Sequence, residues 1–409
     1  MNASTTRFNF SKVSPDGMTA RVLLAFLATA GLYYVNIMPA LVDGLKEGLG
    51  FSNRDAGLVG SANMYGAACG AFLIAFVIRY VHPFKWRISA TILLFSLMGL
   101  DTLSIMTTLP PWLLGVRFMH GLAGGALVGL GFSIIARTVA PDRTFGMLLL
   151  VQALAGGAGV MALPLLVPLF GTRVLFITLI LFSIITLVML QFLPDYPERK
   201  DRIKTDSIVG DVNKQTIMLK PFLLALASVF LFQAGNMALY AFMIGLGKSL
   251  GLDVAFISET LGIANWFGVL GALLVIMLST RFGIFKPILI GMLLTIAGTW
   301  ALHYSDIKWL WVAANILTGI TWNFVIAYLL GMCARFDQSG QSAVWAGFAS
   351  KMGLATGPTI GAFMLVGSQY ANVIYLSVGL LFLACLAASL PALLLDRRVM
   401  IIGEAEARV

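Results

Sequence analysis

The sequence predicts an all-α membrane protein with twelve transmembrane helices arranged as two six-helix halves. Hydrophobic residues make up 59% of the 409 residues and charged residues only 11%, whereas soluble domains carry roughly 25% charged residues. Apolar stretches long enough to cross about 30 Å of hydrocarbon as helices recur about twelve times along the chain. The stretches are continuous instead of alternating between apolar and polar residues, which favours helices over a membrane barrel.

Each predicted span is an apolar run between charged or turn-forming residues. The first half holds residues 20–43, 56–79, 87–108, 111–136, 144–169 and 173–193. The second half holds residues 221–246, 257–280, 284–302, 309–333, 342–367 and 371–395. A polar stretch between the halves contains the mixed-charge run PERKDRIK. We therefore expect a first half at 1–194, a cytoplasmic linker at 195–220 and a second half with a short cytoplasmic tail at 221–409.

The net charge of +9 is distributed unevenly over the predicted loops. With the N-terminus inside, twenty Lys and Arg residues fall on the cytoplasmic side, five on the other side and two within spans. This asymmetry is typical of the positive-inside rule and predicts that both termini are cytoplasmic. The basic charge thus indicates membrane topology and not nucleic-acid binding. We expect a multi-pass, monomeric protein of a cell membrane, such as a bacterial inner membrane, surrounded by lipid.

The two halves repeat each other at a spacing of about 200 residues. Three pairs of equivalent spans share this spacing: Gly66 with Gly268, Asn36 with Asn236, and Gly121 with Gly319. Two halves with the same membrane orientation form the parallel repeat found in transporters. Substrate is then expected near the midplane, between the halves.

The fourth predicted span carries the most specific local motif. Arg117 is followed four residues later by Gly121, and then by Gly124 and Gly125. This pattern resembles the fourth-helix motif of the major facilitator superfamily, and the resemblance covers about residues 15–395. It implies alternating access, with a cavity lined by the first, fourth, seventh and tenth helices. Gly121, Gly125 and Gly129 lie four residues apart, and we interpret them as a close-packing stripe.

The loops after the second and eighth spans keep only part of that family's pattern. Arg79 and Arg281 retain a basic residue, and we expect them to belong to gating loops. Ile78 and Thr280 stand where an Asp would precede each Arg, so the charge relay attributed to that Asp is not supported. The Gly-Pro pair of exporters is missing from the fifth span, which weakens the prediction of a drug and proton antiporter.

Two basic residues, Arg117 and Lys351, lie inside predicted spans. A charge at membrane depth costs about 3 kcal/mol, so each is expected to face a polar cavity or a partner. For Arg117, one interpretation is capture of a carboxylate or phosphate by the guanidinium. The alternative is a salt bridge to Asp101, at a comparable depth on the third span. Lys351 lies about half-way across the eleventh span, where we favour a substrate or charge-balancing role over a gating role.

Mid-span polar and aromatic residues complete the predicted site. His120 shares a helix face with Arg117. The predicted substrate contacts are Arg117, His120, Lys351, Tyr33, Tyr34, Asn36, Gln233, Asn236, Tyr240, Trp322 and Asn323. The candidates for proton coupling are Asp101, Glu259 and His120, and exchange of two anions without a proton remains an alternative.

These features predict a secondary transporter for a small organic anion of the carboxylate type, driven by proton coupling or anion exchange. The alternatives are a proton-driven exporter of drugs or metabolites and a lipid flippase. The sequence contains no phosphate-binding Gly-x-x-x-x-Gly-Lys loop, and its three Cys and three His are scattered. We therefore expect no cofactor, no metal and no enzymatic activity.

Overall fold

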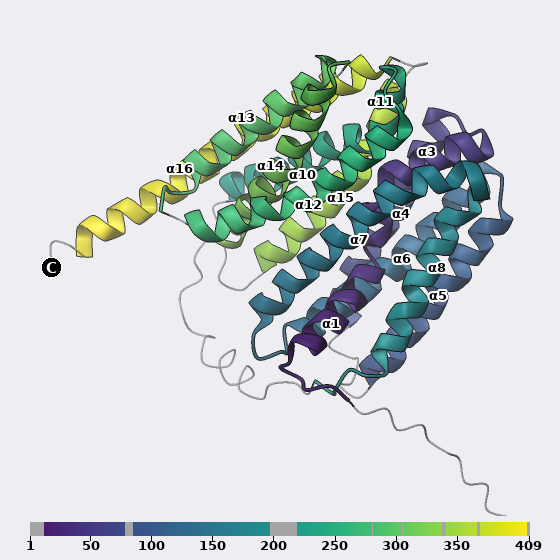
Figure 1. The fold of residues 1–409 in the computed structure, drawn as a ribbon. Coiled ribbons are helices and arrows are strands. Elements are labelled where there is room, and N and C mark those ends of the chain that lie inside the picture. Colours follow the sequence, from purple (N-terminus) through teal and green to yellow (C-terminus); the bar gives the residue numbers. More distant parts are fainter. Residues whose placement is uncertain are drawn as a thin grey trace, which may run out of the picture.

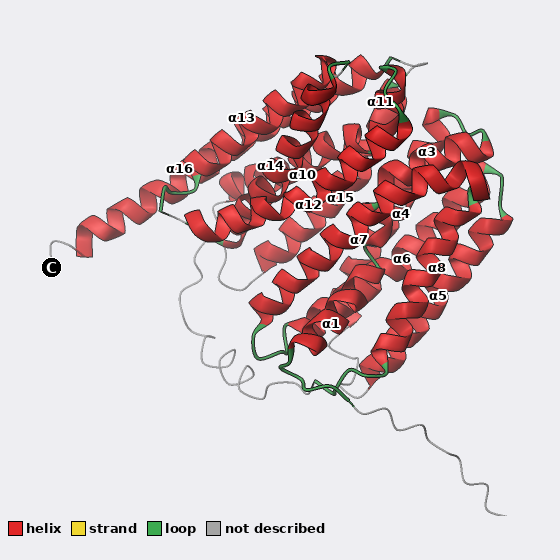
Figure 2. Ribbon diagram, in the orientation of Figure 1, coloured by secondary structure: helices red, strands yellow, loops and turns green. Residues whose placement is uncertain are grey.

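The computed structural model shows a bundle of helices (Figures 1 and 2). It describes residues 12–77, 85–196, 219–279, 281–304, 306–336, 341–365 and 369–406, and these contain no strand. Ten of the described helices are long and apolar enough to cross a membrane. The predicted all-α membrane fold is confirmed. Most of the predicted linker at 195–220, and Arg79 of the first predicted gating loop, lie outside the described residues.

The described residues of the first half form eight helical segments. They are α1 (Met18–Ala30), α2 (Tyr33–Asn36), α3 (Met38–Leu49), α4 (Asn53–Val77), α5 (Trp86–Met106), α6 (Pro110–Ile135), α7 (Pro141–Phe170) and α8 (Arg173–Leu190). The second half contains α10 (Leu219–Tyr240), α11 (Met243–Ser249), α12 (Val254–Leu278), α13 (Phe285–Ala301), α14 (Lys308–Ala334), α15 (Gln341–Met364) and α16 (Tyr370–Glu406), with a 3-10 turn at Leu302–Tyr304.

The prediction of one continuous first helix over 20–43 is wrong. The chain forms three segments, α1 to α3, that continue to Leu49. Ile37 leaves helical geometry at φ −103° and ψ 18°, and Pro39 follows in the first turn of α3. Because Pro has no backbone N–H to donate, it suits the start of a new helix and not the middle of one. The seventh predicted span is likewise divided, between α10 and α11.

The internal repeat is visible in how the helices pack. In the first half, a Cβ on Gly121 of α6 would overlap the backbone oxygen of Asn63 in α4. In the second half, a Cβ on Gly319 of α14 would lie 2.7 Å from the backbone oxygen of Ala264 in α12. Both helix pairs therefore approach closely through glycine, as small residues allow in membranes. The packing interpretation of the glycine stripe is consistent with this contact.

Buried apolar side chains form three clusters. One lies within the first half, one within the second, and the third contains residues of both halves, including Tyr34, Met64 and Phe242. Helix α4 packs against α15 and α7 against α12, so these two pairs join the halves. The shared cluster surrounds the region in which a midplane site was expected.

A group of ion pairs joins the halves at the end of the bundle where α3 and α11 lie, opposite the start of α1 (Figure 1). Lys248 of α11 contacts both carboxylate oxygens of Asp43 at 2.9 and 3.0 Å and Glu47 at 3.0 Å. Lys46 donates to the hydroxyl of Tyr370 at 3.4 Å. We call this group the inter-half latch. It holds the two halves together at that end.

A second ion cluster joins Lys12, which precedes α1, and Arg87 of α5 to Asp195 in the segment that follows α8. Asp195 lies 3.1 Å from Lys12 and 3.1 Å from Arg87, and Arg87 also donates to the backbone oxygen of Leu193. Partial burial opposes ionisation of Asp195, but the hydrogen bond from Lys12 and the charge of Arg87 outweigh it and lower its pKa. The cluster therefore stays ionised at neutral pH.

Candidate functional site

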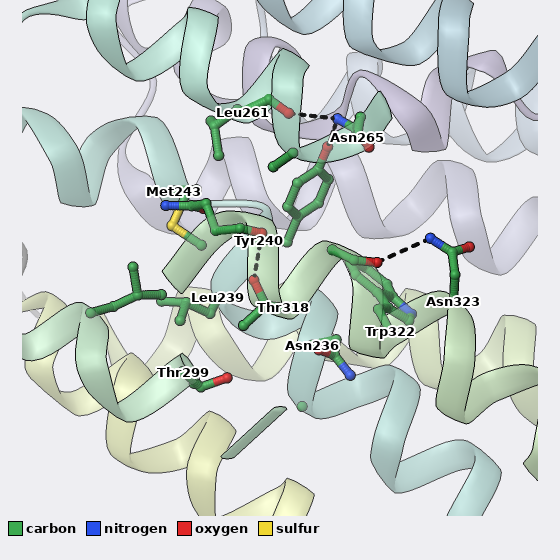
Figure 3. Close-up of a pocket in the computed structure, with 15 residues that line it drawn as sticks. Asn236, Leu239, Tyr240, Met243, Leu261, Asn265, Thr299, Thr318, Trp322 and Asn323 are labelled. Carbon is green, nitrogen blue, oxygen red and sulfur yellow. Dashed lines mark hydrogen bonds between the residues drawn. The ribbon is translucent and has the colours of Figure 1, made fainter. Parts of the chain in front are cut away.

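A polar pocket lies inside the second half, between α10, α12, α13 and α14 (Figure 3). Its wall includes Asn236 and Tyr240 from α10, Asn265 from α12, and Trp322 and Asn323 from α14. The described residues that line it include no acid and no base. The cavity measures about 70 Å³, against about 30 Å³ for one molecule of liquid water. In this conformation it therefore holds only part of a small solute.

Hydrogen bonds fix the orientation of the pocket's polar side chains. The Asn265 amide donates to the Tyr240 hydroxyl at 3.0 Å and to the backbone oxygen of Leu261 at 3.2 Å (Figure 3). The Tyr240 and Trp322 rings meet edge to face with their centroids 5.6 Å apart. Tyr240 also donates to the backbone oxygen of Asn36 at 3.4 Å. The pocket is thus connected to the first half through α2.

Behind the pocket, a chain of hydrogen bonds joins three helices. The indole N–H of Trp322 donates to Gln233 Oε1 at 2.6 Å, and Gln233 Nε2 donates to the hydroxyl of Ser350 at 2.8 Å. A buried polar side chain with both ends satisfied is held in one orientation. Gln233 therefore positions the indole ring that forms one wall of the pocket.

Four of the predicted contacts, Asn236, Tyr240, Trp322 and Asn323, line this pocket together. Sequence reasoning missed Asn265. A signal for it existed, because Asn265 lies 202 residues after Asn63 in the repeat. The repeat alone does not indicate that the Asn265 side chain faces a cavity.

Arg117 lies in the first half, in a buried cluster outside the pocket. Its side chain is fully buried, as is that of Asp101, and its guanidinium contacts Asp101 Oδ1 at 2.9 Å. It also donates to the Ser104 hydroxyl at 2.6 Å and to the backbone oxygen of Leu100 at 3.0 Å. This geometry fits the interpretation of a salt bridge. Direct capture of an anion by Arg117 would require the pair to open, and it stays a prediction.

His120 extends this cluster to α4. Its Nε2 lies 3.3 Å from Asp101 Oδ1, and its Nδ1 lies 2.7 Å from the amide of Asn63. The rings of Tyr34 and Phe176 lie 5.7 and 5.1 Å from the Arg117 guanidinium carbon. Asp101, Arg117 and His120 thus form one buried ionisable cluster, which we call the Asp101 cluster. It contains two of the three residues predicted to couple transport to protons.

Lys351 lies in the middle of α15 and is partly buried. Helical spacing puts it on the same side as Ala355 and Ala362, which belong to the apolar cluster shared by the two halves. In the part of the chain that the structure describes, no ion pair or hydrogen bond of Lys351 is found. Its neighbour Ser350 bonds Gln233, so Lys351 lies one residue from the chain behind the pocket.

The remaining predicted residues lie elsewhere. Tyr33 is buried and stacks on Phe182 at 4.6 Å. Asn36 is partly buried, and its backbone oxygen accepts a hydrogen bond from the pocket residue Tyr240. Glu259 and Arg281 are exposed. The structure therefore groups most of the predicted residues into a second-half pocket and a first-half ionisable cluster.

Comparisons with known proteins agree with this architecture. The family model described as Major Facilitator Superfamily matches residues 22–350. The uncharacterized MFS-type transporter YceJ of Bacillus subtilis (strain 168) is 23% identical over 325 residues, which cover 77% of this chain and 82% of YceJ.

Solved structures are similar in fold. The crystal structure of a D-xylose-proton symporter has a TM-score of 0.68 at 15% identity and covers 92% of this chain and 96% of its own. The nucleoside transporter NupG has a TM-score of 0.66 at 15% identity and covers 91% and 98%. The family match spans most of the chain, and its two-half architecture is the one seen here; the chain belongs to the Major Facilitator Superfamily of secondary transporters.

Proposed function

We propose that this transporter moves a small, polar, uncharged solute, recognised by the pocket between α10, α12 and α14. The observation that carries the proposal is the lining itself, in which four Asn residues and the Tyr240 and Trp322 rings meet without an acid or base among the described residues. Amides both donate and accept hydrogen bonds. Aromatic walls with a few placed polar groups are typical of small-molecule sites.

Hydroxyl groups on an otherwise apolar ring would suit this lining. The amides of Asn236, Asn265 and Asn323 would bond the hydroxyls, and the indole of Trp322 would cover the apolar face of the ring. Sugars and nucleosides have this character, and proteins of similar fold are named for transport of D-xylose and nucleosides. These similarities support the proposed substrate class only through the shared fold.

A second candidate substrate is the small organic anion predicted from sequence. The observation that favours it is Lys351, a cation in the middle of a span for which the described residues supply no ionic partner. An anionic group next to the Gln233–Ser350 bond would compensate that charge. In this case the pocket would hold the polar part of the solute and Lys351 its carboxylate.

A thermal-shift screen of the purified protein distinguishes the two candidates, because a ligand that prefers the folded state raises the apparent melting temperature. The panel contains sugars and nucleosides, carboxylates, and cationic amines. Stabilisation by neutral solutes that is lost in Asn236→Ala but kept in Asn372→Ala, a partly exposed residue of α16 outside the pocket, supports the first candidate. Stabilisation by carboxylates that is lost in Lys351→Met supports the second, and hits confined to cations would refute both.

We also propose that the Asp101 cluster is the site at which transport is coupled to protons. A buried carboxylate shared by Arg117 and His120 changes its partners when it is protonated. Asn63 and Gly121 join the cluster directly to the α4–α6 contact. Protonation there would alter the packing of two helices that run through the first half.

The charge distribution supports an orientation with the chain's N-terminus in the cytoplasm. On this topology the inter-half latch lies at the outer face, and the ends of α3, α5 and α7 lie there too. The structure then corresponds to a state closed on the outside. Sidedness is tested by tagging the C-terminus, which is expected to be accessible only after the membrane is opened.

A further inference from the structure

The first half has a cavity of its own, separate from the substrate pocket. It lies where α3, α5 and α7 end and α8 begins, and its volume is about 360 Å³. At about 30 Å³ per molecule, that is space for roughly a dozen waters. Its polar lining consists of Ser104, Thr107, Thr108, Thr172 and Arg173. Hydroxyl groups of this kind can both accept and pass on hydrogen bonds from water.

The floor of this cavity touches the Asp101 cluster. Ser104 lines the cavity and accepts a hydrogen bond from Arg117 at 2.6 Å. Phe176 lines it as well, and its ring lies 5.1 Å from the guanidinium carbon. Asp101 precedes Ser104 by three residues on α5, which is about 4.5 Å along the helix axis. The cavity therefore ends within one helical turn of the buried carboxylate.

The cluster also contains buried polar atoms that the described residues leave without a hydrogen-bond partner. They are Asp101 Oδ2, Arg117 Nε and the hydroxyl oxygen of Tyr34. Buried polar atoms in folded proteins nearly always bond to protein or to water. The ionisable groups that face Asp101 are Arg117 and His120 from α6 and Tyr34 from α2, while α4 supplies the amide of Asn63 and α8 the ring of Phe176. Access of water to this cluster would satisfy these atoms.

We propose that this cavity is the route by which water and protons from the outer face reach Asp101, apart from the path of the substrate. The proposal rests on the proposed proton coupling at the Asp101 cluster. A hydronium ion in the cavity transfers its proton to the Asp101 carboxylate, which leaves a water molecule and a neutral carboxyl group.

The route predicts that a bulky group in the cavity uncouples the transporter. Cys69, Cys333 and Cys385 are replaced by Ala, and Thr107→Cys is added. Among the described residues, the Thr107 hydroxyl bonds only the backbone oxygen of Leu103. The variant is reconstituted in liposomes and treated from the outer face with a large membrane-impermeant thiol reagent. The same sample is assayed before and after treatment, so the protein has already folded. The matched control is Ala371→Cys, an exposed position at the start of α16.

The transported probe is a neutral solute from the thermal-shift screen. Modification of Thr107→Cys is expected to abolish most of the uptake driven by a pH gradient while leaving exchange of labelled for unlabelled solute, and the control is expected to keep both. If uptake driven by the pH gradient persisted after complete modification, the proposed route would be wrong. Proton coupling at Asp101 would not be affected by that result. If uptake did not depend on the pH gradient before any treatment, both proton coupling at Asp101 and the proposed route would be wrong.

Discussion

Arg117 and Asp101 stabilise each other in a site that neither would occupy alone. Both side chains are fully buried and lie 2.9 Å apart. Removing one partner of a buried ion pair leaves an uncompensated charge, at a cost of about 3–5 kcal/mol. We therefore predict that Asp101→Asn lowers the stability of the protein severely, as measured by thermal unfolding in detergent.

The double variant Asp101→Asn with Arg117→Gln removes both charges and is expected to recover most of the lost stability, because neither buried group is then charged. Glu259→Gln serves as the control, since Glu259 is exposed, and should melt like the parent protein. An Asp101→Asn protein as stable as the parent would contradict a buried pair.

The indole N–H of Trp322 and its aromatic ring have separate roles in the pocket. Its N–H bonds Gln233 at 2.6 Å, and Trp322→Phe would keep an aromatic wall while leaving the Gln233 oxygen unpaired. An unsatisfied buried acceptor costs about 1–3 kcal/mol. We predict weaker solute binding, measured as a smaller ligand-induced thermal shift. Trp309→Phe, at an exposed tryptophan, should leave the shift unchanged, and an equal loss in both variants would refute the role of the Gln233 bond.

At the scale of elements, the contact between α4 and α6 depends on glycine. A Cβ on Gly121 would overlap the backbone of Asn63, whereas a Cβ on Gly115, one and a half turns earlier in α6, would meet nothing within 4 Å. Backbone cannot move aside as a flexible side chain can. Gly121→Ala is therefore expected to separate the helices and lower the melting temperature.

Gly115→Ala is the matched control for that substitution. It should be neutral or stabilising by up to about 1 kcal/mol, because Ala favours helix over Gly. Melting temperatures and the yield of monodisperse protein measure both variants. If Gly121→Ala behaved like Gly115→Ala, the close approach of α4 and α6 would not be needed for folding.

Some features of these helices could be predicted from the sequence and others could not. Apolar runs, loop charges and the 200-residue repeat predicted the spans and the two halves, because each depends on local composition or on chain order. The break at Ile37 was missed because Tyr33, Tyr34 and Asn36 sit in a continuous apolar run, and only tertiary packing favours a new helix at Pro39. A repeated glycine such as Gly319 could be recognised, but its partner Ala264 required coordinates.

The site was harder to predict than the spans. Periodicity indicates which residues share a helix face, but not whether that face meets a cavity or another helix. Arg117 and Trp322 both occupy mid-span positions, yet one is sealed against Asp101 and the other lines a pocket. The salt bridge was foreseen as an alternative because a comparable depth on neighbouring helices can be counted along the chain.

At the scale of the whole molecule, the inter-half latch is expected to control opening at the outer face. Lys248 bonds Asp43 and Glu47 across the halves, so Lys248→Ala removes the shared cation and leaves two acids that repel each other. We predict a shift toward states open at that end. Spin labels at Arg173→Cys and Lys308→Cys, in the background lacking the native cysteines, report the distance between the halves.

Lys12→Ala is the control for the latch, because the Lys12–Asp195 ion pair lies within the first half. Its distance distribution should match that of the parent, whereas Lys248→Ala should populate longer distances. Identical distributions in the two variants would show that apolar packing between α4 and α15 and between α7 and α12 holds the outer end closed without the latch.

We propose that the two halves bind different ligands: the Asp101 cluster of the first half binds protons, and the pocket of the second half binds the solute. This proposal is tested most directly in proteoliposomes, by comparing gradient-driven uptake with solute exchange for the Asp101→Asn, Arg117→Gln double variant and for Asn236→Ala. We expect the double variant to lose uptake driven by a pH gradient but to keep exchange, and Asn236→Ala to lose both. Equal loss of both activities in the double variant, or proton-driven uptake that persists in it, would show that protons and solute do not use separate sites.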